Sequence, residues 1–383
     1  MNALNNRFSV TAVFGTRPEA IKMAPVVNAL AMERSIDLKV CVSAQHRQML
    51  DQVLEVFEIR PDIDLDLMRP NQSLADITAN AIKGLEAAFT KLRPNLVLVH
   101  GDTTTTMAAS MAAYYQRIPV AHVEAGLRTG DIYSPWPEEV NRRITGAIAE
   151  LNFAPTEGAK RNLLSENVPP ETITVTGNTV VDALYRARQI VHERPGFARE
   201  LDKKFGLVSE KRLLLVTGHR RENFGKGFER ICKAISLLSR RQDIHIIYPV
   251  HLNPNVQTPV QKWLKGIDNV SLIEPQDYLP FVYLMSRAHI ILTDSGGVQE
   301  EAPSLGKPVL VMRDTTERPE ALEAGTALLV GTSVDAIVEQ TNLLLDDHAR
   351  YLGMSEAHNP YGDGCAARRI VDKILEFAQA REF

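Results

Sequence analysis

Acidic side chains stand at or just after the ends of two apolar runs in the first half of the chain. Asp102 closes the run LVLVHGD, and Glu124 lies in IPVAHVEAG, with Glu138 and Glu139 following in YSPWPEEVNRR. A run such as 95–99 is typical of a fully buried strand, so a charge at its end is expected to face a cleft. Buried charge without a partner is costly, and several acids together indicate proton-transfer chemistry.

Each of these acids also has a purely structural interpretation. Asp102 could be the N-cap of a helix that begins near Thr105. Glu138 and Glu139 follow a proline and could be first-turn helix acids. Glu124 could form an ordinary ion pair with one of three later arginines, Arg128, Arg142 or Arg143.

Basic and glycine-rich motifs follow other apolar runs. DSGG at Asp294–Gly297 offers close backbone approach and a helix N-terminus, and TGHRREN at Thr217–Asn223 offers an imidazole and guanidinium groups. Together they favour phosphate binding, although SGG could be a bare turn and the arginines a solvated face. Glu300 or Glu301 could bind ribose hydroxyls or could be a first-turn helix acid. Near the first strand, Arg17 is the better cleft candidate, and Lys22 would ordinarily be a surface lysine.

Several binding motifs are missing from the sequence. GKG at Gly225–Gly227 lacks the third glycine of GxGxxG, and no GxxxxGK[ST] occurs. His46, His219 and His251 are far apart, and none has a partner at i+4. We therefore predict neither a bound dinucleotide nor a metal, and no other cofactor.

Short β-branched runs alternate with amphipathic segments along the chain. The strands expected in the first half are Val10–Phe14, Leu38–Ser43, Leu96–His100, Val120–Glu124, Leu151–Ala154 and Ile173–Thr176. Those expected in the second half are Leu213–Thr217, Ile244–Val250, Val270–Ile273, Ile290–Thr293, Val309–Met312 and Ala327–Val330. Between them lie helical patterns, among them Arg47–Phe57, Leu74–Leu92, Thr104–Gln116 and Val180–Glu193. Such alternation predicts an α/β fold of two doubly wound, parallel-sheet, Rossmann-like domains.

The chain length of 383 residues also favours two domains. We place the first at 1–178 and the second at 179–365. A final helix over 366–383 either caps its own domain or crosses back to the first. Because ligands of open α/β sheets bind outside the carboxyl ends of the strands, a site in the cleft between the domains is expected.

Composition restricts the class of partner. A net charge of −4 argues against a nucleic acid or an anionic membrane surface as the main partner. The cysteines Cys41, Cys232 and Cys365 form no CxxC pair, which is typical of a reducing compartment. No signal peptide or membrane span is indicated, and we expect a cytoplasmic protein.

Taken together, the motifs resemble the non-hydrolysing UDP-N-acetylglucosamine 2-epimerases of bacteria over essentially the whole length. The shared segments are FGTRPEAIKMAP, AQHRQMLDQV, VHGDTTTT, HVEAGLRTGDIYSPWPEEVNRR, VTGHRREN, PVHLNP, LTDSGGVQEEAPSLGKPV and MRDTTERPEA. The resemblance implies a GT-B glycosyltransferase-like architecture with the active site between the domains. It also implies interconversion of UDP-GlcNAc and UDP-ManNAc, which supplies cell-surface polysaccharide synthesis, and usually a homodimer.

The resemblance also assigns roles to individual residues. The catalytic set would be Asp102, Glu124, Glu138 and His219, the last of which would also hold phosphate. Substrate would be bound by Arg17, Lys22, Arg220, Ser295, Gly296, Gly297 and Glu301. A second UDP-GlcNAc would act as an allosteric activator through Gln45, Gln48 and His251.

Inverting C2 of the sugar requires removal of a hydrogen from a carbon that is not adjacent to a carbonyl. The family mechanism is anti elimination of UDP to 2-acetamidoglucal, followed by re-addition on the other face, and carboxylates would move the proton. The missing dinucleotide fingerprint argues against oxidation by NAD. Three alternatives stay open, namely a hydrolysing epimerase that releases ManNAc and UDP, a GT-B glycosyltransferase, and a nucleotide-sugar sensor without activity.

Overall fold

The computed structural model describes residues 7–43, 47–69, 71–207 and 210–381. Two compact units divide the chain, the first formed by residues 1–183 with 361–383 and the second by residues 184–360. The sequence-based boundary at 178/179 falls at the start of α7 (Thr179–His192), the helix that carries the chain from one unit into the other.

The first unit is built on a seven-stranded parallel sheet in the order β3-β2-β1-β4-β5-β6-β7. Its strands are β1 (Phe8–Phe14), β2 (Ile36–Val42), β3 (Ile63–Asp64), β4 (Leu96–His100), β5 (Val120–Val123), β6 (Leu151–Ala154) and β7 (Ile173–Val175). Every residue of β4 is buried, because helices cover both faces of the sheet.

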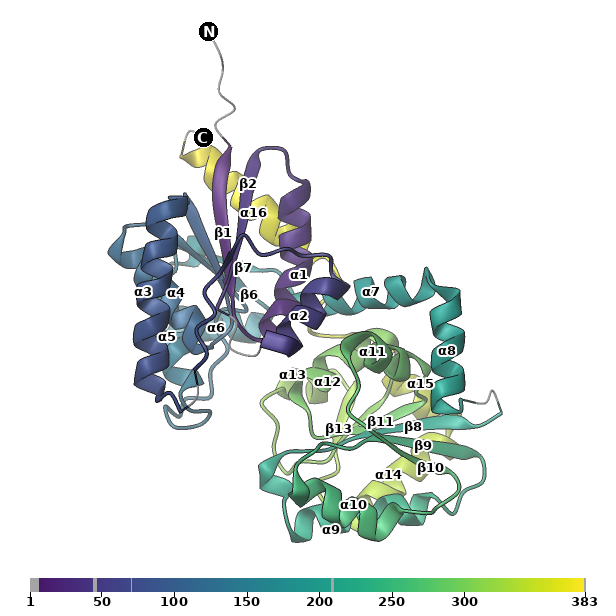
Figure 1. Ribbon diagram of the computed structural model, residues 1–383. Helices are drawn as coiled ribbons and strands as arrows, with labels where there is room; N and C mark the ends of the chain where they lie inside the picture. Colours follow the sequence, from purple (N-terminus) through teal and green to yellow (C-terminus); the bar gives the residue numbers. More distant parts are fainter. Residues whose placement is uncertain (1–6, 44–46, 70, 208–209, 382–383) are drawn as a thin grey trace. The chain divides into compact units, whose positions relative to one another are not determined.

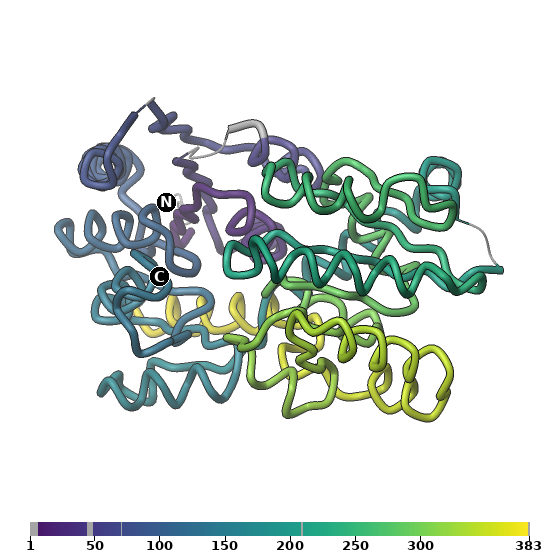
Figure 2. Tube along the Cα trace, turned by 90° about the horizontal axis from the view of Figure 1, so that it is seen from below, coloured from purple at the N-terminus to yellow at the C-terminus, as the bar shows by residue number. Residues whose placement is uncertain are grey.

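Helices cover the two faces of this sheet in separate groups (Figure 1). One face carries α1 (Arg17–Met32), α2 (Arg47–Val56) and α16 (Ala366–Ala380), and the other carries α3 (Leu74–Leu92), α4 (Thr104–Tyr115) and α5 (Glu138–Ile148). A further helix, α6 (Glu157–Ser165), follows β6. The final helix α16 packs on α1, with the rings of Phe377 and Phe8 6.3 Å apart, and Figure 2 shows this yellow helix among the purple and blue elements.

The start of α16 is fixed by a buried carboxylate of the same unit. Asp182 accepts hydrogen bonds from the backbone amides of Ala366 (3.3 Å) and Ala367 (2.9 Å). These amides have no partner inside their own helix, so the carboxylate satisfies them and favours the helix N-terminus electrostatically. The last helix therefore belongs to the first unit by both packing and capping.

The second unit is built on a six-stranded parallel sheet in the order β10-β9-β8-β11-β12-β13. Its strands are β8 (Arg212–Thr217), β9 (Ile244–Pro249), β10 (Val270–Ile273), β11 (Ile290–Thr293), β12 (Val309–Val311) and β13 (Ala327–Leu329). Its helices are α8 (Pro195–Phe205), α9 (Lys226–Leu238), α10 (Pro254–Leu264), α11 (Tyr278–Arg287), α12 (Gly296–Glu301), α13 (Pro319–Glu323), α14 (Val334–Asp346) and α15 (His348–Ser355). Helices α9, α10 and α14 lie on one face and α11 and α12 on the other (Figure 1).

Both sheets reverse their strand order beside the first strand of each unit. In the first unit β1 pairs with β2 on one side and β4 on the other, and in the second β8 pairs with β9 and β11. This is the strand order of a Rossmann sheet, whose ligands bind at the carboxyl ends next to the reversal. Asp102 follows β4, while His219 and Asp294 follow β8 and β11.

The predicted fold class, two doubly wound Rossmann-like domains of the GT-B kind, is confirmed. All twelve predicted strands are present, and four of them have the predicted bounds: Leu96–His100, Leu151–Ala154, Val270–Ile273 and Ile290–Thr293. The pattern missed the two-residue strand β3 and gave no helix for the polar segment that forms α8. No helix among the described residues combines the length and apolar character needed to cross a bilayer.

Candidate active site

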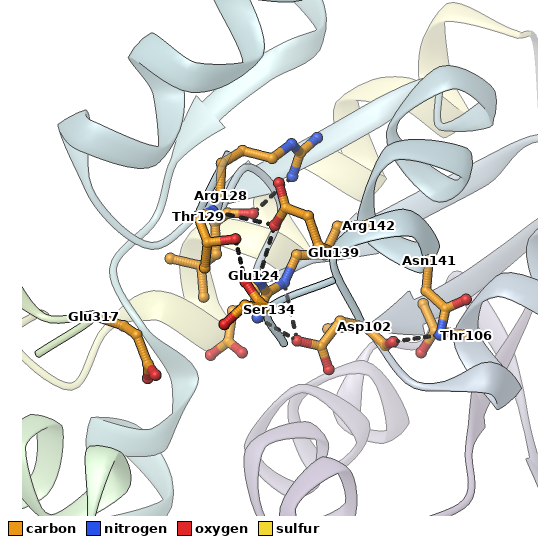
Figure 3. Close-up of polar contacts among 12 residues, drawn as sticks. Asp102, Thr106, Glu124, Arg128, Thr129, Ser134, Glu139, Asn141, Arg142 and Glu317 are labelled. Atoms are coloured by element: carbon orange, nitrogen blue, oxygen red, sulfur yellow. Dashed lines mark hydrogen bonds and ion pairs between the residues drawn. The ribbon is translucent and has the colours of Figure 1, made fainter. Parts of the chain in front are cut away.

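Asp102 lies in the short loop between β4 and α4, and its side chain is held by Arg142 from α5 (Figure 3). Arg142 donates to Oδ2 of Asp102 from Nε at 3.0 Å and from Nη2 at 2.6 Å. The side-chain amide of Asn141 donates to the Asp102 carbonyl at 2.9 Å. The N-cap of α4 is Thr103, which accepts from the Thr106 amide, so the capping interpretation of Asp102 was wrong.

The two acids at the start of α5 have different surroundings. Glu139 is fully buried, and its carboxylate accepts from the backbone amides of Thr129 (3.1 Å) and Gly130 (3.3 Å) and from Arg142 (3.2 Å). Burial raises the pKa of Glu139, but these amides and the Arg142 charge together hold it below its ordinary value. In Glu138, by contrast, Oε2 is buried and accepts no hydrogen bond from the described residues. Glu139 is therefore occupied by structure, whereas Glu138 has an oxygen left for a ligand.

Glu124 directly follows β5 with a backbone φ of 63°, the left-handed region that side chains disfavour. Lys22 of α1 forms an ion pair with its Oε2, to which the Asn178 side chain also donates at 3.0 Å. His100 Nε2 lies 4.0 Å from the same oxygen. The arginines expected as partners bind other acids, since Arg128 pairs with Glu166 while Arg142 and Arg143 bond Glu139. Lys22 is thus no ordinary surface lysine.

A buried histidine fixes the backbone next to Asp102. His122 Nε2 lies 2.7 Å from the carbonyl oxygen of Gly101 and must donate to it, because a carbonyl only accepts. Burial is the main cause that lowers the pKa of His122 to about 3, so the ring is neutral near pH 7. A neutral ring that donates through Nε2 carries its proton there, and it restrains the loop without adding charge beside the acids.

In the second unit, Asp294 holds the loop that follows β8. Its Oδ2 accepts from the backbone amides of His219 and Arg220, each at 2.9 Å, and from the Asn223 side chain at 3.3 Å. Its Oδ1 lies 3.6 Å from His219 Nδ1. In Arg220, Nε is buried and has no hydrogen-bond partner among the described residues. The backbone of the loop is fixed, and a donor group remains for an anion.

The neighbours of His219 change its pKa in opposite directions. Its ring stacks on His251, with centroids 5.5 Å apart and planes 16° apart. Burial lowers the pKa of His219, and the charge of Asp294 opposes that change while His251 and Arg220 add to it. His219 is 44% exposed, so one side of the imidazole is open to a ligand.

The glycine motif forms the start of the short helix α12. Ser295 precedes Gly296 as the N-cap and makes no side-chain cap, so its hydroxyl is not used there. A Cβ on Gly296 would lie 3.0 Å from the Arg318 guanidinium, whereas one on Gly297 would meet nothing closer than 4.0 Å. The backbone therefore approaches an arginine closely at Gly296 and is open at Gly297.

The two acids of α12 lie at its end, not in its first turn, which corrects the first-turn interpretation. Glu300 accepts from Arg318 Nε at 2.9 Å. Glu301 accepts from the Tyr278 hydroxyl at 3.3 Å. No group of His, Cys, Asp and Glu within the described residues is arranged to hold a metal ion.

Comparison with known proteins identifies the family of this chain. A family model described as UDP-N-acetylglucosamine 2-epimerase matches residues 28–375. The UDP-N-acetylglucosamine 2-epimerase of Escherichia coli K12 is 59% identical over 367 residues, which cover 95% of this chain and 98% of that protein.

Solved structures give the same result. The Neisseria meningitidis UDP-GlcNAc 2-epimerase bound to UDP-GlcNAc has a TM-score of 0.89 at 53% identity and covers 96% of this chain and 100% of that one. The Methanocaldococcus jannaschii enzyme in complex with UDP-GlcNAc and UDP has a TM-score of 0.78 at 34% identity and covers 96% and 99%. The chain belongs to the UDP-N-acetylglucosamine 2-epimerase family.

The site residues predicted for an epimerase of this family fall into two groups. In the first unit, Asp102, Glu124, Glu138 and Lys22 follow or face the carboxyl ends of β1, β4 and β5, and Arg17 is the half-exposed first residue of α1. In the second unit, His219, Arg220, His251, Ser295, Gly296, Gly297 and Glu301 follow β8, β9 and β11. Gln45 and the side chain of Gln48 lie outside the described residues.

Sequence reasoning missed several residues that hold this epimerase site together. Arg142 was considered only as a partner of Glu124, and Asn141, Asn178 and Asp294 were not assigned separate roles. Spacing gives no signal for such residues, because their partners come from strands far away in the sequence. Asp294 is the exception, since it heads the DSGG motif at a strand end.

Proposed function

We propose that this chain interconverts UDP-GlcNAc and UDP-ManNAc without net hydrolysis. Relatives at 59% and 53% identity carry the name of this epimerase, and one of them is described with UDP-GlcNAc bound. The reaction is elimination of UDP from C1 to give 2-acetamidoglucal, followed by re-addition of UDP after the proton has returned to the opposite face of C2.

The observation that carries the proposal is the pairing of two acids with two separate cations. Asp102 and Glu124 follow adjacent parallel strands, and Arg142 holds the first while Lys22 holds the second. Each carboxylate has its own counterion, which offsets the repulsion between the two neighbouring acids. An ionised carboxylate can remove the C2 proton as UDP leaves.

Two faces of the sugar require more than one acid. We assign Asp102 or Glu124 to one face and Glu138 to the other. Glu138 suits the second face because its buried Oε2 has no partner among the described residues. In the return step an acid on the opposite face, protonated from solvent, delivers its proton to C2 and so becomes the base of the reverse reaction, while the first acid releases to solvent the proton that it took.

The departing diphosphate would be stabilised by the second unit. His219, Arg220 and Ser295 are the donors, and the open backbone at Gly297 gives a phosphate oxygen room to approach. Lys22 is paired with Glu124. Arg17 and Lys22 would meet the sugar and the diphosphate, while Glu301 would accept from the ribose hydroxyls. One preorganised donor of this kind is worth about 3–4 kcal/mol in the transition state.

A purified sample tests this assignment against the hydrolysing alternative. Incubation with UDP-GlcNAc alone should give a mixture of the two UDP-sugars by NMR, with no stoichiometric free ManNAc. Accumulation of UDP and ManNAc in equal amounts would show hydrolysis, and no change without an acceptor would point to a transferase or a sensor. The acids paired with cations favour epimerisation over a sensor, which has no use for them.

We propose in addition that UDP-GlcNAc activates the enzyme at a second site and that the enzyme is a cytoplasmic homodimer. His251, stacked on His219, would connect the regulatory contact with the phosphate site. In this proposal Gln45 and Gln48 would also take part in the regulatory contact. Activation is checked by the dependence of the rate on UDP-GlcNAc concentration, which should be sigmoidal in wild type and hyperbolic in His251→Ala. The dimer is checked by the mass of the protein in solution.

A further inference from the structure

Glu19 is a buried carboxyl that the epimerase chemistry described above does not use. It is 2% exposed and lies in the first turn of α1, two residues after Arg17. Its Oε2 accepts from the backbone amides of Gly15 (3.0 Å) and Thr16 (2.8 Å). Its Oε1 accepts from the hydroxyl groups of Thr103 (2.6 Å) and Thr106 (3.1 Å).

These contacts connect two loops that follow different strands. Gly15 and Thr16 belong to the loop after β1, and Thr103 is the neighbour of Asp102 after β4. Thr106 Oγ1 also lies 2.5 Å from the carbonyl oxygen of His100, the last residue of β4. Glu19 therefore contacts the segment directly after Asp102, and it is linked to His100, before Asp102, indirectly through Thr106.

The loop after β1 packs closely against residues that follow β2 and β4. A Cβ on Gly15 would lie 1.9 Å from Ser43 Oγ and 2.8 Å from Thr105 Oγ1, and these two hydroxyl oxygens are 2.8 Å apart. The ends of β1, β2 and β4 thus meet through small polar side chains with no space between them. A displacement of the β1 loop would be transmitted to the Asp102 loop.

We propose that Glu19 is a positioning residue for Asp102, which holds the acid in place through Thr103 and Thr106. The proposal rests on the proposed function, because it assigns the effect of Glu19 to proton transfer at C2. Glu19 itself touches no reacting atom. The hydrogen bonds of Glu19, and not its charge, hold Asp102 in position.

Two substitutions separate hydrogen bonding from charge. In Glu19→Gln the amide oxygen can replace Oε2 and accept from both backbone amides, while the amide nitrogen replaces Oε1 and donates to the threonine oxygens. Every contact is then kept with the direction reversed on one side. Glu19→Ala removes all four contacts and leaves the amides of Gly15 and Thr16 without this partner.

The experiment compares four proteins: wild type, Glu19→Gln, Glu19→Ala and the control Ile374→Ala. Ile374 is fully buried on α16, one turn before Phe377, which packs near the start of β1, so the control destabilises the same unit away from the strand ends. Steady-state kcat and KM are measured with UDP-GlcNAc, and UDP affinity is measured by calorimetry. Should Glu19→Ala fold poorly, Thr103→Val breaks the same link from the other side, and Thr103→Ser should keep it.

We expect Glu19→Ala to lose about 10²-fold in kcat, the scale of an ångström-sized misplacement, with UDP affinity unchanged. Glu19→Gln should keep most of the wild-type kcat, and Ile374→Ala should keep kcat per folded molecule. The proposal is overturned by a normal kcat in Glu19→Ala, by a Glu19→Gln variant as inactive as Glu19→Ala, or by an equal loss of kcat in Ile374→Ala.

Hydrogen exchange gives a readout that does not depend on turnover. Amides of residues 101–107 should exchange faster in Glu19→Ala than in wild type, Glu19→Gln or Ile374→Ala. Unchanged exchange in this segment would contradict the proposal even if the wild-type protein formed no UDP-ManNAc. A wild-type protein without epimerase activity, with the exchange difference present, would instead remove the proposed function and leave the loop connection standing.

Discussion

Arg142 places both of its hydrogen bonds to Asp102 on a single oxygen, Oδ2, with Nε at 3.0 Å and Nη2 at 2.6 Å. Its third nitrogen, Nη1, bonds Glu139 at 3.2 Å. One guanidinium thus fixes the orientation of Asp102 and links it to a buried acid. This relationship cannot be derived from spacing, because 40 residues separate the two side chains.

Arg142→Lys should lower kcat by roughly 10²-fold, because a point charge cannot bond Asp102 and Glu139 in the same planar geometry. Arg143→Lys is the matched control, since the neighbouring Arg143 is 44% exposed and, among the described residues, forms an ion pair with Glu139 alone, at 3.5 Å. Steady-state kinetics compare the kcat of Arg142→Lys with that of Arg143→Lys. Equal effects of the two substitutions would show that Arg142 has no special role.

Glu138→Gln and Glu139→Gln should have opposite consequences. Glu138→Gln should lose at least ~100-fold in kcat with little change in the unfolding free energy, and Asp102→Asn and Glu124→Gln should lose a similar factor in kcat. Glu139→Gln should lose about 1–3 kcal/mol of unfolding free energy, because buried donors lose their charged acceptor. Kinetics and denaturant unfolding of the same preparations test this, and full turnover in Glu138→Gln would remove that residue from the mechanism.

The Glu139 contribution to stability should depend on pH in a defined direction. The folded pKa of Glu139 lies below its ordinary value of 4.5, so its stabilisation is present above that value. It is lost as pH falls through the lower, folded pKa. The stability difference between wild type and Glu139→Gln should therefore shrink in acid and stay constant near neutral pH.

Glu19 should show the reverse dependence. Burial is the main cause that raises its pKa above the ordinary value, so the folded state favours the protonated form. The associated stabilisation is present at low pH and is lost as pH rises through the raised pKa. Glu19→Gln resembles the protonated acid. Its melting temperature should therefore rise relative to that of wild type as pH increases. A constant difference from pH 5 to pH 8 would contradict this assignment.

The pH dependence of UDP affinity should report His219. An imidazolium binds phosphate better than a neutral ring, so affinity should fall as pH rises through the His219 pKa, which lies below 6.5. Asp294→Asn removes the charge that raises this pKa and should move the fall to lower pH. His251→Asn removes a group that lowers it and should move the fall to higher pH.

Calorimetric titration with UDP across pH measures these shifts. The ionisation of UDP itself is common to all three proteins, so the comparison isolates the protein. Shifts in the same direction for both variants would show that His219 is not the titrating group.

The strands were predictable because a strand that is buried on both faces has a continuous run of apolar residues in the sequence. The helix Leu74–Leu92 has its predicted bounds, and Ser73 and Asp76 form the capping box that begins it. The strand β3 was not predictable, since two residues form no periodic pattern.

The candidate site was predictable in its residue types but not in its pairings. Strand ends identified Asp102, Glu124 and Asp294, because polar residues after buried runs lie at the carboxyl edge of the sheet. The cations that hold the acids come from other elements, and sequence reasoning assigned Glu124 to arginines where the structure has Lys22. Glu19 was read as part of a motif, and only the folded structure shows that it connects two loops.

Isotope exchange at C2 tests whether the C2 proton leaves and returns during the reaction. The purified protein is incubated with UDP-GlcNAc in D2O, and the C2 proton signals of both UDP-sugars are followed by NMR. We expect deuterium to enter C2 of UDP-GlcNAc and UDP-ManNAc while free UDP and ManNAc stay below stoichiometric amounts. Formation of UDP-ManNAc with its C2 hydrogen retained, or no exchange at all, would contradict this expectation.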